Sequence, residues 1–137
     1  MDVEARYCAS HGGIRRRFPL AGGDINVVER WELADGTTCV RKKPRTPVTG
    51  IYDAERESLN ELAKGPLRVP VVFEVGPNWI LMEDLGDGEP HVNLWAELGR
   101  GLAYLHQVTH DHFGFERDNF LGLTRQPNPW TGDGHAF

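Results

Sequence analysis

Residues 25–43 read INVVERWELADGTTCVRKK and decide the fold. Apolar and polar residues alternate up to the Asp35-Gly36 pair, and a second strand-like run follows it. Alternation is typical of a strand with one buried face, and Asp-Gly between two such runs is a strong signal for a tight hairpin. We therefore predict antiparallel strands at 25–33 and 37–43. One face of the first strand would carry Ile25, Val27, Glu29, Trp31 and Leu33, and the other would carry Asn26, Arg30 and Glu32.

Periodicity and turn residues predict further elements on both sides of this hairpin. They are a helix at 2–10, a strand at 14–20, a helix at 51–64, strands at 69–75 and 79–82, a linker at 85–90, a helix at 92–108 and an irregular stretch at 110–137. Pro19 indicates that the strand at 14–20 lies at a sheet edge. The helix at 51–64 is expected to have an apolar stripe of Tyr52, Leu59, Leu62 and Ala63. This order of elements favours an α+β fold in which an antiparallel sheet carries a helix on one face.

Composition excludes several classes of protein. The 137 residues are 39% hydrophobic and 26% charged, which is globular composition and not that of a disordered, collagen-like or coiled-coil chain. The formal charge of -5 argues against nucleic-acid binding. No apolar run approaches the ~20 residues that span a bilayer, and the first residues lack the order of a signal peptide, so we expect a cytoplasmic protein without a membrane partner. Cys8 and Cys39 are expected to be free thiols.

Charge is unevenly distributed along the chain. Residues 1–50 hold nine Lys/Arg and six Asp/Glu, whereas residues 51–137 hold six and fourteen. A mildly basic first half suits a small anionic ligand held near the N-terminal part. Chance asymmetry on a solvated surface is an equally good explanation at this point.

Glu55 is the first candidate for a functional residue. It follows Tyr52 by one helical turn and so shares the apolar stripe, where a carboxylate needs a cation. Lys42, near the end of the preceding strand, could supply that cation, as a strand lysine does for a helix glutamate in protein kinases. The alternative is that Glu55 lies at the edge of the stripe and reaches water.

Two further segments could contact a nucleotide. Gly22-Gly23-Asp24-Ile25-Asn26 joins two strands, and glycines in such a turn let backbone N–H groups approach a phosphate, although most Gly-Gly turns are plain hairpins. Leu81-Met82-Glu83-Asp84-Leu85 runs from an apolar strand into the linker, where backbone groups could meet an adenine edge. The alternative for this second segment is a strand end with two solvated acids.

Histidine spacing gives only a weak signal for a metal. His106 and His110 stand four residues apart, but no cysteine or HExxH partner accompanies them and the helix is expected to end near 108, so we predict no metal site. Cys39 lies within a strand and is expected to be a core residue, not a nucleophile.

The ordered set of motifs resembles the fructosamine kinases over about residues 14–130. The N-terminal part of the resemblance rests on Gly22 to Asn26, Cys39-Val40-Arg41-Lys42, Tyr52 to Leu59, Val69-Pro70 and Leu81-Met82-Glu83. More specific strings follow in family order and spacing: LGRGLAYLH at 98–106, FGF at 113–115, DNFLG at 118–122 and QPNPW at 126–130. They match the LGxxLAxLH, FGFxxDNxxG and QxNxW segments of that family.

The resemblance implies a protein-kinase-like fold, related to aminoglycoside phosphotransferases and choline kinases. Residues 1–86 would form the N-terminal lobe, a five-stranded antiparallel sheet with one packed helix, and residues 87–137 the linker and first helix of an incomplete C-terminal lobe. The family transfers the ATP γ-phosphate to a sugar hydroxyl of a ketosamine, which leads to release of the glycated amine, so ATP and Mg²⁺ are the implied cofactors and a glycated amine the implied substrate.

Residue roles follow from matching positions. Gly22, Gly23, Asp24, Ile25 and Asn26 would cover the phosphates, while Lys42 would contact the α- and β-phosphates and Glu55 would hold Lys42. Met82, Glu83 and Leu85 would lie along the adenine. Lys43 replaces Lys42 if the strand register differs by one residue.

The chain departs from the family pattern in two ways. Asp24 stands where some members carry a redox-active cysteine, so we expect no such switch. No His-Gly-Asp string occurs, so the general base and the Mg²⁺ ligands are expected beyond Phe137 and the chain alone is expected to be inactive. The alternative function is a non-catalytic nucleotide-binding or interaction module, which could self-associate through the apolar face of the helix at 92–108.

Overall fold

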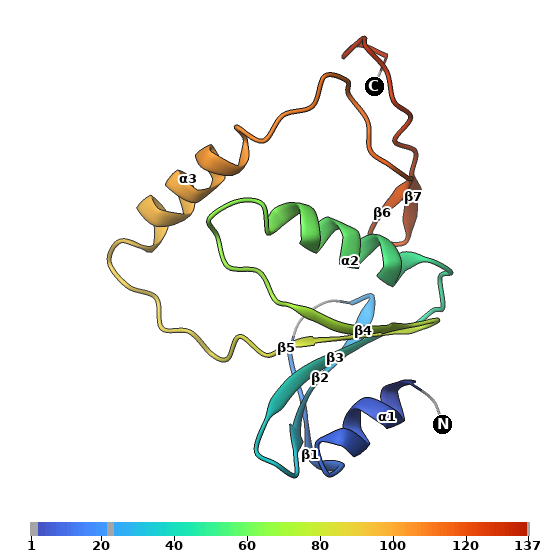
Figure 1. The fold of residues 1–137 in the computed structure, drawn as a ribbon, viewed down its shortest axis with the longest axis vertical. Coiled ribbons are helices and arrows are strands. Elements are labelled where there is room, and N and C mark those ends of the chain that lie inside the picture. Colours follow the sequence, from blue (N-terminus) through green and yellow to red (C-terminus); the bar gives the residue numbers. More distant parts are fainter. Residues whose placement is uncertain (1–2, 22–23, 137) are drawn as a thin grey trace. The chain divides into compact units, whose positions relative to one another are not determined.

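The computed structural model describes residues 3–21 and 24–136 (Figure 1). Its elements in chain order are α1 (Val3–Ser10), β1 (Ile14–Pro19), β2 (Asn26–Leu33), β3 (Thr38–Pro44), α2 (Ile51–Leu62), β4 (Val72–Gly76), β5 (Trp79–Glu83), α3 (Leu94–Leu105), β6 (Asn119–Leu121) and β7 (Thr124–Gln126). No helix among these residues has the length and apolarity that crossing a membrane requires.

Strands β1 to β5 form one antiparallel sheet in the order β1-β2-β3-β5-β4. This arrangement confirms the predicted five-stranded antiparallel sheet. β1 lies at an edge of the sheet, as Pro19 indicated, because proline has no backbone N–H to donate to a neighbouring strand. β4 is the other edge strand and β3 is the central one.

The predicted hairpin of β2 and β3 is confirmed, and its turn has a clear local cause. The Asp35 carboxylate accepts hydrogen bonds from the backbone N–H of Thr37 at 2.9 Å and from its hydroxyl at 2.7 Å. Gly36 has a φ of 88°, a left-handed conformation that glycine adopts at little cost. These bonds, with one from His11, lower the pKa of Asp35 to about 2.

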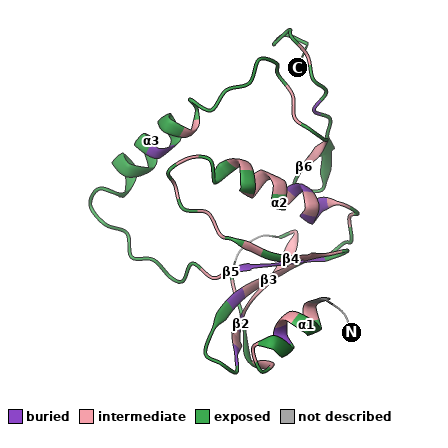
Figure 2. Cartoon of the chain, viewed as in Figure 1, coloured by how far each residue is buried: buried purple, intermediate pink, exposed green. Residues whose placement is uncertain are grey.

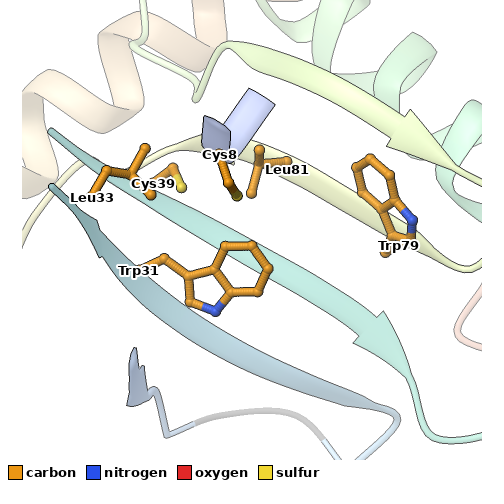
Figure 3. Packing of buried hydrophobic residues seen from close by; sticks show 6 residues of the cluster. All are labelled: Cys8, Trp31, Leu33, Cys39, Trp79 and Leu81. Atoms are coloured by element: carbon orange, nitrogen blue, oxygen red, sulfur yellow. The ribbon is translucent and has the colours of Figure 1, made fainter. Parts of the chain in front are cut away.

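One face of the sheet carries the apolar core that α1 covers (Figure 3). The cluster consists of Cys8, Trp31, Leu33, Cys39, Trp79 and Leu81, with Tyr7 and Ile14 packed against it. Its strand residues alternate along β2, β3 and β5, as a pleated strand requires. Cys39 is fully buried, and burial raises the pKa of its thiol to about 12, so the prediction that it is a core residue is confirmed. Both cysteines are free thiols, also as predicted.

The chain forms two compact units, and α2 belongs to both. The first comprises 1–53 and 70–86, and the second comprises 54–69 and 87–137. Residues 54–69 therefore group with the later part of the chain, whereas the predicted first domain included them. The domain boundary stays a prediction.

The apolar stripe expected on α2 is only partly buried (Figure 2). Tyr52 is 2% exposed, and Ile51 and Ala54 are also buried. Leu62, however, is 43% exposed, and Ala63 lies after the helix end and is exposed. The predicted helix end was therefore wrong for Ala63, and the stripe is enclosed by neighbouring side chains only near the beginning of α2.

The predicted irregular stretch at 110–137 contains a defined structure instead. β6 and β7 form an antiparallel pair in which Asn119 lies opposite Gln126 and Leu121 lies opposite Thr124. Phe113 and Thr131 form an isolated β-bridge. The error has a physical reason, since strands of three residues are too short to show alternation in the sequence.

Helix α3 is exposed along most of its length, and a glycine makes one of its close contacts. Gly101 is the buried residue of α3, and a Cβ at this position would lie 2.3 Å from Cδ2 of Leu67. Gly99, on the same helix, has open space where its Cβ would be. Trp95, at 79% exposure, lies on the apolar face that the sequence analysis proposed for self-association, which stays a prediction.

These two glycines give a matched test of the α3 packing. We expect Gly99→Ala to stabilise the chain by up to about 1 kcal/mol, because alanine favours helix and nothing obstructs its methyl group. Gly101→Ala should be the less stable of the two variants by about 1–3 kcal/mol, because the methyl overlaps Leu67. The free energy of unfolding in urea measures both, and equal stabilities would contradict the packing.

Candidate functional site

Lys42 lies on the sheet face opposite the α1 core. In the register, Lys42 pairs with Val28 on one side and with Ile80 on the other, whereas its neighbour Lys43 pairs with Val27. Directly paired residues share a face and successive residues alternate. Lys42 therefore shares a face with Ile80, which is fully buried, and Lys43 is on the α1 face with an exposed side chain.

Asn26 ties this same face to the start of α2. It pairs with Pro44, two residues after Lys42 in β3, and so it lies on the face of Lys42. The Tyr52 hydroxyl donates a 2.9 Å hydrogen bond to the Asn26 side-chain oxygen. The first turn of α2 is therefore held against the Lys42 face of the sheet. Glu55 follows Tyr52 by one turn in α2 and is partly buried, and its pairing with Lys42 stays a prediction.

The predicted phosphate-covering turn is described in part. Gly22 and Gly23 lie outside the described residues, and Asp24 is exposed. Ile25 accepts a backbone hydrogen bond from Arg45 at 2.9 Å, which fixes the end of the turn against the residue after β3. The sequence suggested a role for the backbone N–H of Asn26. In the structure the Asn26 side chain also accepts a hydrogen bond, which holds Tyr52.

The end of β5 carries the residues predicted to meet adenine. Met82 is 8% exposed and lies opposite Val40 of β3, on the Lys42 face. Glu83 donates its N–H to the Val71 carbonyl at 2.8 Å and accepts the Val71 N–H on its side chain at 3.2 Å. Leu85, beyond the strand, is 46% exposed. The three predicted residues thus form a strand end that emerges at the surface.

Arg30 and Asp84 form the polar contact that the sequence analysis missed. The guanidinium Nε lies 2.7 Å from Asp84 Oδ2, and Nη2 donates to Oδ1 at 3.1 Å. The Asp84 side chain is only 7% exposed, so the alternative of two solvated acids at this strand end is wrong for Asp84. No sequence signal links the two residues, because 54 positions separate them.

Electrostatics keep Asp84 ionised. Burial alone would raise the pKa of this carboxyl, but hydrogen bonds from the Gly86 amide, Arg30 and Thr38, together with the Arg30 charge, bring the pKa below its ordinary value. The Gly86 N–H donates at 3.0 Å, so the linker begins with a fixed turn. Asp84 thereby anchors the start of the linker to β2.

Metal-ligating residues are not gathered in this part of the molecule. No group of three or more His, Cys, Asp or Glu side chains among residues 3–21 and 24–136 could hold a metal ion. His110 instead stacks on Trp130, with ring centroids 4.4 Å apart.

The catalytic groups expected beyond Phe137 are not tested by this structure. Phe137 is the last residue of the sequence and itself lies outside the described residues, like Gly22 and Gly23. The position of the general base and of the Mg²⁺ ligands beyond Phe137 therefore stays a prediction.

Comparison with known proteins first defines the class of fold. A crystal structure from Haemophilus somnus, provisionally named a fructosamine-3-kinase, superposes with a TM-score of 0.79 at 24% identity, over 94% of this chain and 47% of that one. A second, from Thermobifida fusca and named in the same way, gives 0.76 at 23% identity, over 96% of this chain and 48% of that one. With the five-stranded antiparallel sheet, this likeness defines an α+β, kinase-like N-terminal lobe.

The sequence comparisons then identify the family. The family model described as fructosamine kinase matches residues 5–137, and the chain belongs to that family. A "probable ketoamine kinase" of Enterococcus faecium is 32% identical over 88% of this chain and 43% of its own length. The chloroplastic protein-ribulosamine 3-kinase of Arabidopsis thaliana is 33% identical over 86% of this chain and 38% of its own. The chain thus spans less than half the length of these relatives.

Removing the Asp84 charge tests the anchor between linker and sheet. We expect Asp84→Asn to lower the free energy of unfolding by about 1.5–3 kcal/mol at pH 7, because it removes the anion that faces the largely buried Arg30 guanidinium. The control Glu32→Gln breaks the more exposed Arg15–Glu32 pair and should cost less than about 1 kcal/mol.

The pH dependence of this difference has a definite sign. Because the folded-state pKa of Asp84 is lowered, its stabilisation is complete above the unfolded-state pKa of about 3.9 and is lost as the pH falls through the folded-state value. The gap between wild type and Asp84→Asn, measured by urea unfolding, should shrink only below about pH 4. A gap that already shrinks between pH 7 and pH 5 would contradict the ion pair.

Proposed function

We propose that this chain carries the ATP-binding part of a fructosamine or ketosamine kinase. The observation that supports the proposal most directly is the placement of Lys42 on the sheet face that Tyr52 and Asn26 tie to α2. A lysine in a central strand, facing the helix that carries a glutamate, is the arrangement that contacts nucleotide phosphates in protein kinases.

The proposed phosphate site is electrostatic. The Lys42 ammonium contacts the α- and β-phosphates, and the Glu55 carboxylate holds the ammonium in place and offsets the loss of its hydration. Backbone N–H groups of the turn from Gly22 to Asn26 donate hydrogen bonds to the phosphates. Asn26 connects this turn to α2, because it is the last residue of the turn and its side chain accepts a hydrogen bond from the Tyr52 hydroxyl.

Adenine is proposed to lie along the end of β5. Met82 supplies an apolar surface, and backbone groups of Glu83 and Leu85 meet the polar edge of the base. The Arg30–Asp84 ion pair holds the linker where these groups emerge. The chain's own contribution is therefore to bind and orient the nucleotide.

Phosphoryl transfer to a glycated amine needs groups that this sequence does not contain. The family's His-Gly-Asp string does not occur in it, so we place the general base and the Mg²⁺ ligands beyond Phe137, outside these 137 residues. Mg²⁺ would neutralise the phosphate charge during transfer. The proposed substrate is a sugar-derived ketosamine, in line with the ribulosamine kinase name of the Arabidopsis relative.

Nucleotide binding by the purified chain tests the phosphate site. We expect Lys42→Ala to weaken ATP binding about 10–100-fold, because a charge-assisted contact is worth about 1.5–3 kcal/mol. The matched control Lys43→Ala removes the same charge from the opposite face of the same strand and should leave the affinity within about twofold. Isothermal titration calorimetry measures both, and equal affinities for wild type and Lys42→Ala would overturn the role of Lys42.

Catalysis is tested separately. We expect the purified chain to produce no phosphorylated fructosamine from ATP, because it supplies no general base for the sugar hydroxyl. ³¹P NMR of a mixture with ATP, Mg²⁺ and a small fructosamine measures the product. Turnover above the protein-free control would show that the chain contains its own catalytic base.

A further inference from the structure

The most specific motifs of the chain, FGF, DNFLG and QPNPW, build a structure that the proposed nucleotide site does not use. We call residues 113–131 the clasp. Its ends are joined by two backbone hydrogen bonds between Phe113 and Thr131, at 2.9 and 2.8 Å. Gly114 has a φ of 129°, and a Cβ there would lie 2.7 Å from the Pro129 carbonyl oxygen. Only glycine therefore fits the closed clasp at this point.

A buried asparagine organises the interior of the clasp. Asn128 is 5% exposed, and its side-chain amide donates to the Arg117 carbonyl at 3.3 Å. Its backbone N–H donates to Asp118 Oδ1 at 3.0 Å, and its carbonyl accepts the Phe115 N–H at 3.1 Å. The backbone around Arg117 is thus fixed from both sides, although its side chain is 60% exposed.

The Arg117 side chain contacts α2. Its Nη2 lies 2.8 Å from Oε1 of Glu57, whose side chain is 25% exposed. The other carboxylate oxygen, Oε2, is buried and has no hydrogen-bond partner among the described residues. A carboxylate with one oxygen already removed from water depends on its single cation more strongly than a fully exposed one does.

Apolar packing around this contact is incomplete. A cavity of about 370 Å³ is lined by residues of α2, the end of α3 and the clasp. It is separate from a cavity of about 390 Å³ under α1. The lining of the cavity beside α2 includes Leu62, Leu105, Phe115 and Asn119. Because side chains leave this cavity beside the later part of α2 unfilled, the Arg117–Glu57 ion pair adds a polar restraint where apolar packing is incomplete.

We propose that Arg117 is a positioning residue, which holds the second turn of α2 through Glu57 and thereby fixes the place of Glu55 in that turn. The consequence for ATP binding rests on the proposed function, which gives Glu55 its role. Glu55 and Glu57 are separated by one residue in the same helix, so a shift of this turn moves both. The clasp then supports the turn of α2 that carries Glu55.

Hydrogen exchange of α2 tests the restraint without any nucleotide. We expect Arg117→Gln and Glu57→Gln to speed amide exchange about 3–10-fold in peptides from α2, and to leave β2 and β3 unchanged. Lys64→Gln is the control, since it removes a cation paired with Glu61 of the same helix at an exposed position. Arg117→Lys, which keeps the positive charge, should retain most of the wild-type protection of the α2 amides from exchange. Unchanged α2 exchange in Arg117→Gln would overturn the proposal.

ATP affinity tests the link to Lys42. We expect Arg117→Gln to weaken ATP binding about 2–5-fold in the wild-type background, and to have no effect in the Lys42→Ala background. A merely destabilising substitution would weaken binding equally in both backgrounds, and that result would overturn the positioning role. Faster α2 exchange with unchanged affinity would overturn it as well.

The two proposals fail in distinguishable ways. If the wild-type chain binds no ATP, the proposed function is wrong, and with it the role of Glu55 in ATP binding. The exchange experiment still decides whether Arg117 restrains α2 in that case. If ATP binds and depends on Lys42 but α2 exchange does not respond to Arg117→Gln, only the positioning role is wrong.

Discussion

Alternation along β2, β3 and β5 is the constraint on which the rest of the first unit depends. Because successive side chains alternate between faces, Trp31, Cys39 and Leu81 all face α1 and form one apolar cluster (Figure 3). The same rule assigns Asn26, Lys42 and Asp84 to the other face. A shift of one residue in the register would exchange the two sets and would turn the apolar cluster away from α1. The burial of the apolar cluster thus fixes which of the two lysines lies on the face opposite α1.

The second face combines buried apolar residues, such as Ile80 and Met82, with polar contacts between distant segments. Arg30 and Asp84 join β2 to the start of the linker, and Tyr52 joins α2 to the first residue of β2. Both contacts are directional, and both connect segments far apart in the chain. A face built in this way holds its neighbours at defined positions and still leaves polar groups close to a ligand. This suits a site that binds a nucleotide by charge and by backbone hydrogen bonds.

The sequence predicts the parts of this structure whose causes are local. The β2–β3 hairpin follows from alternation and from one Asp-Gly turn, and the edge position of β1 follows from Pro19. The Arg30–Asp84 pair could not be predicted, because its partners are brought together only by the order of the strands. The exposure of Leu62 depends likewise on what packs beside α2. The β6–β7 pair was missed for a different reason. Its two strands are close in the sequence, but strands of three residues are too short to show alternation.

The motifs that identify the family most clearly are not the ones proposed to contact a ligand. Gly101 of the LGRGLAYLH string packs closely against the Leu67 side chain, and Gly114 of FGF is required by the Pro129 carbonyl. Asn128 of QPNPW is buried and holds the backbone of Arg117. Such residues permit few substitutions, because their environment is fixed on every side. Lys42 and Glu55 lie in strings that are individually weak. The family resemblance is therefore carried mainly by the requirements of packing, and the ligand-binding role of a residue has to be argued from the face on which it lies.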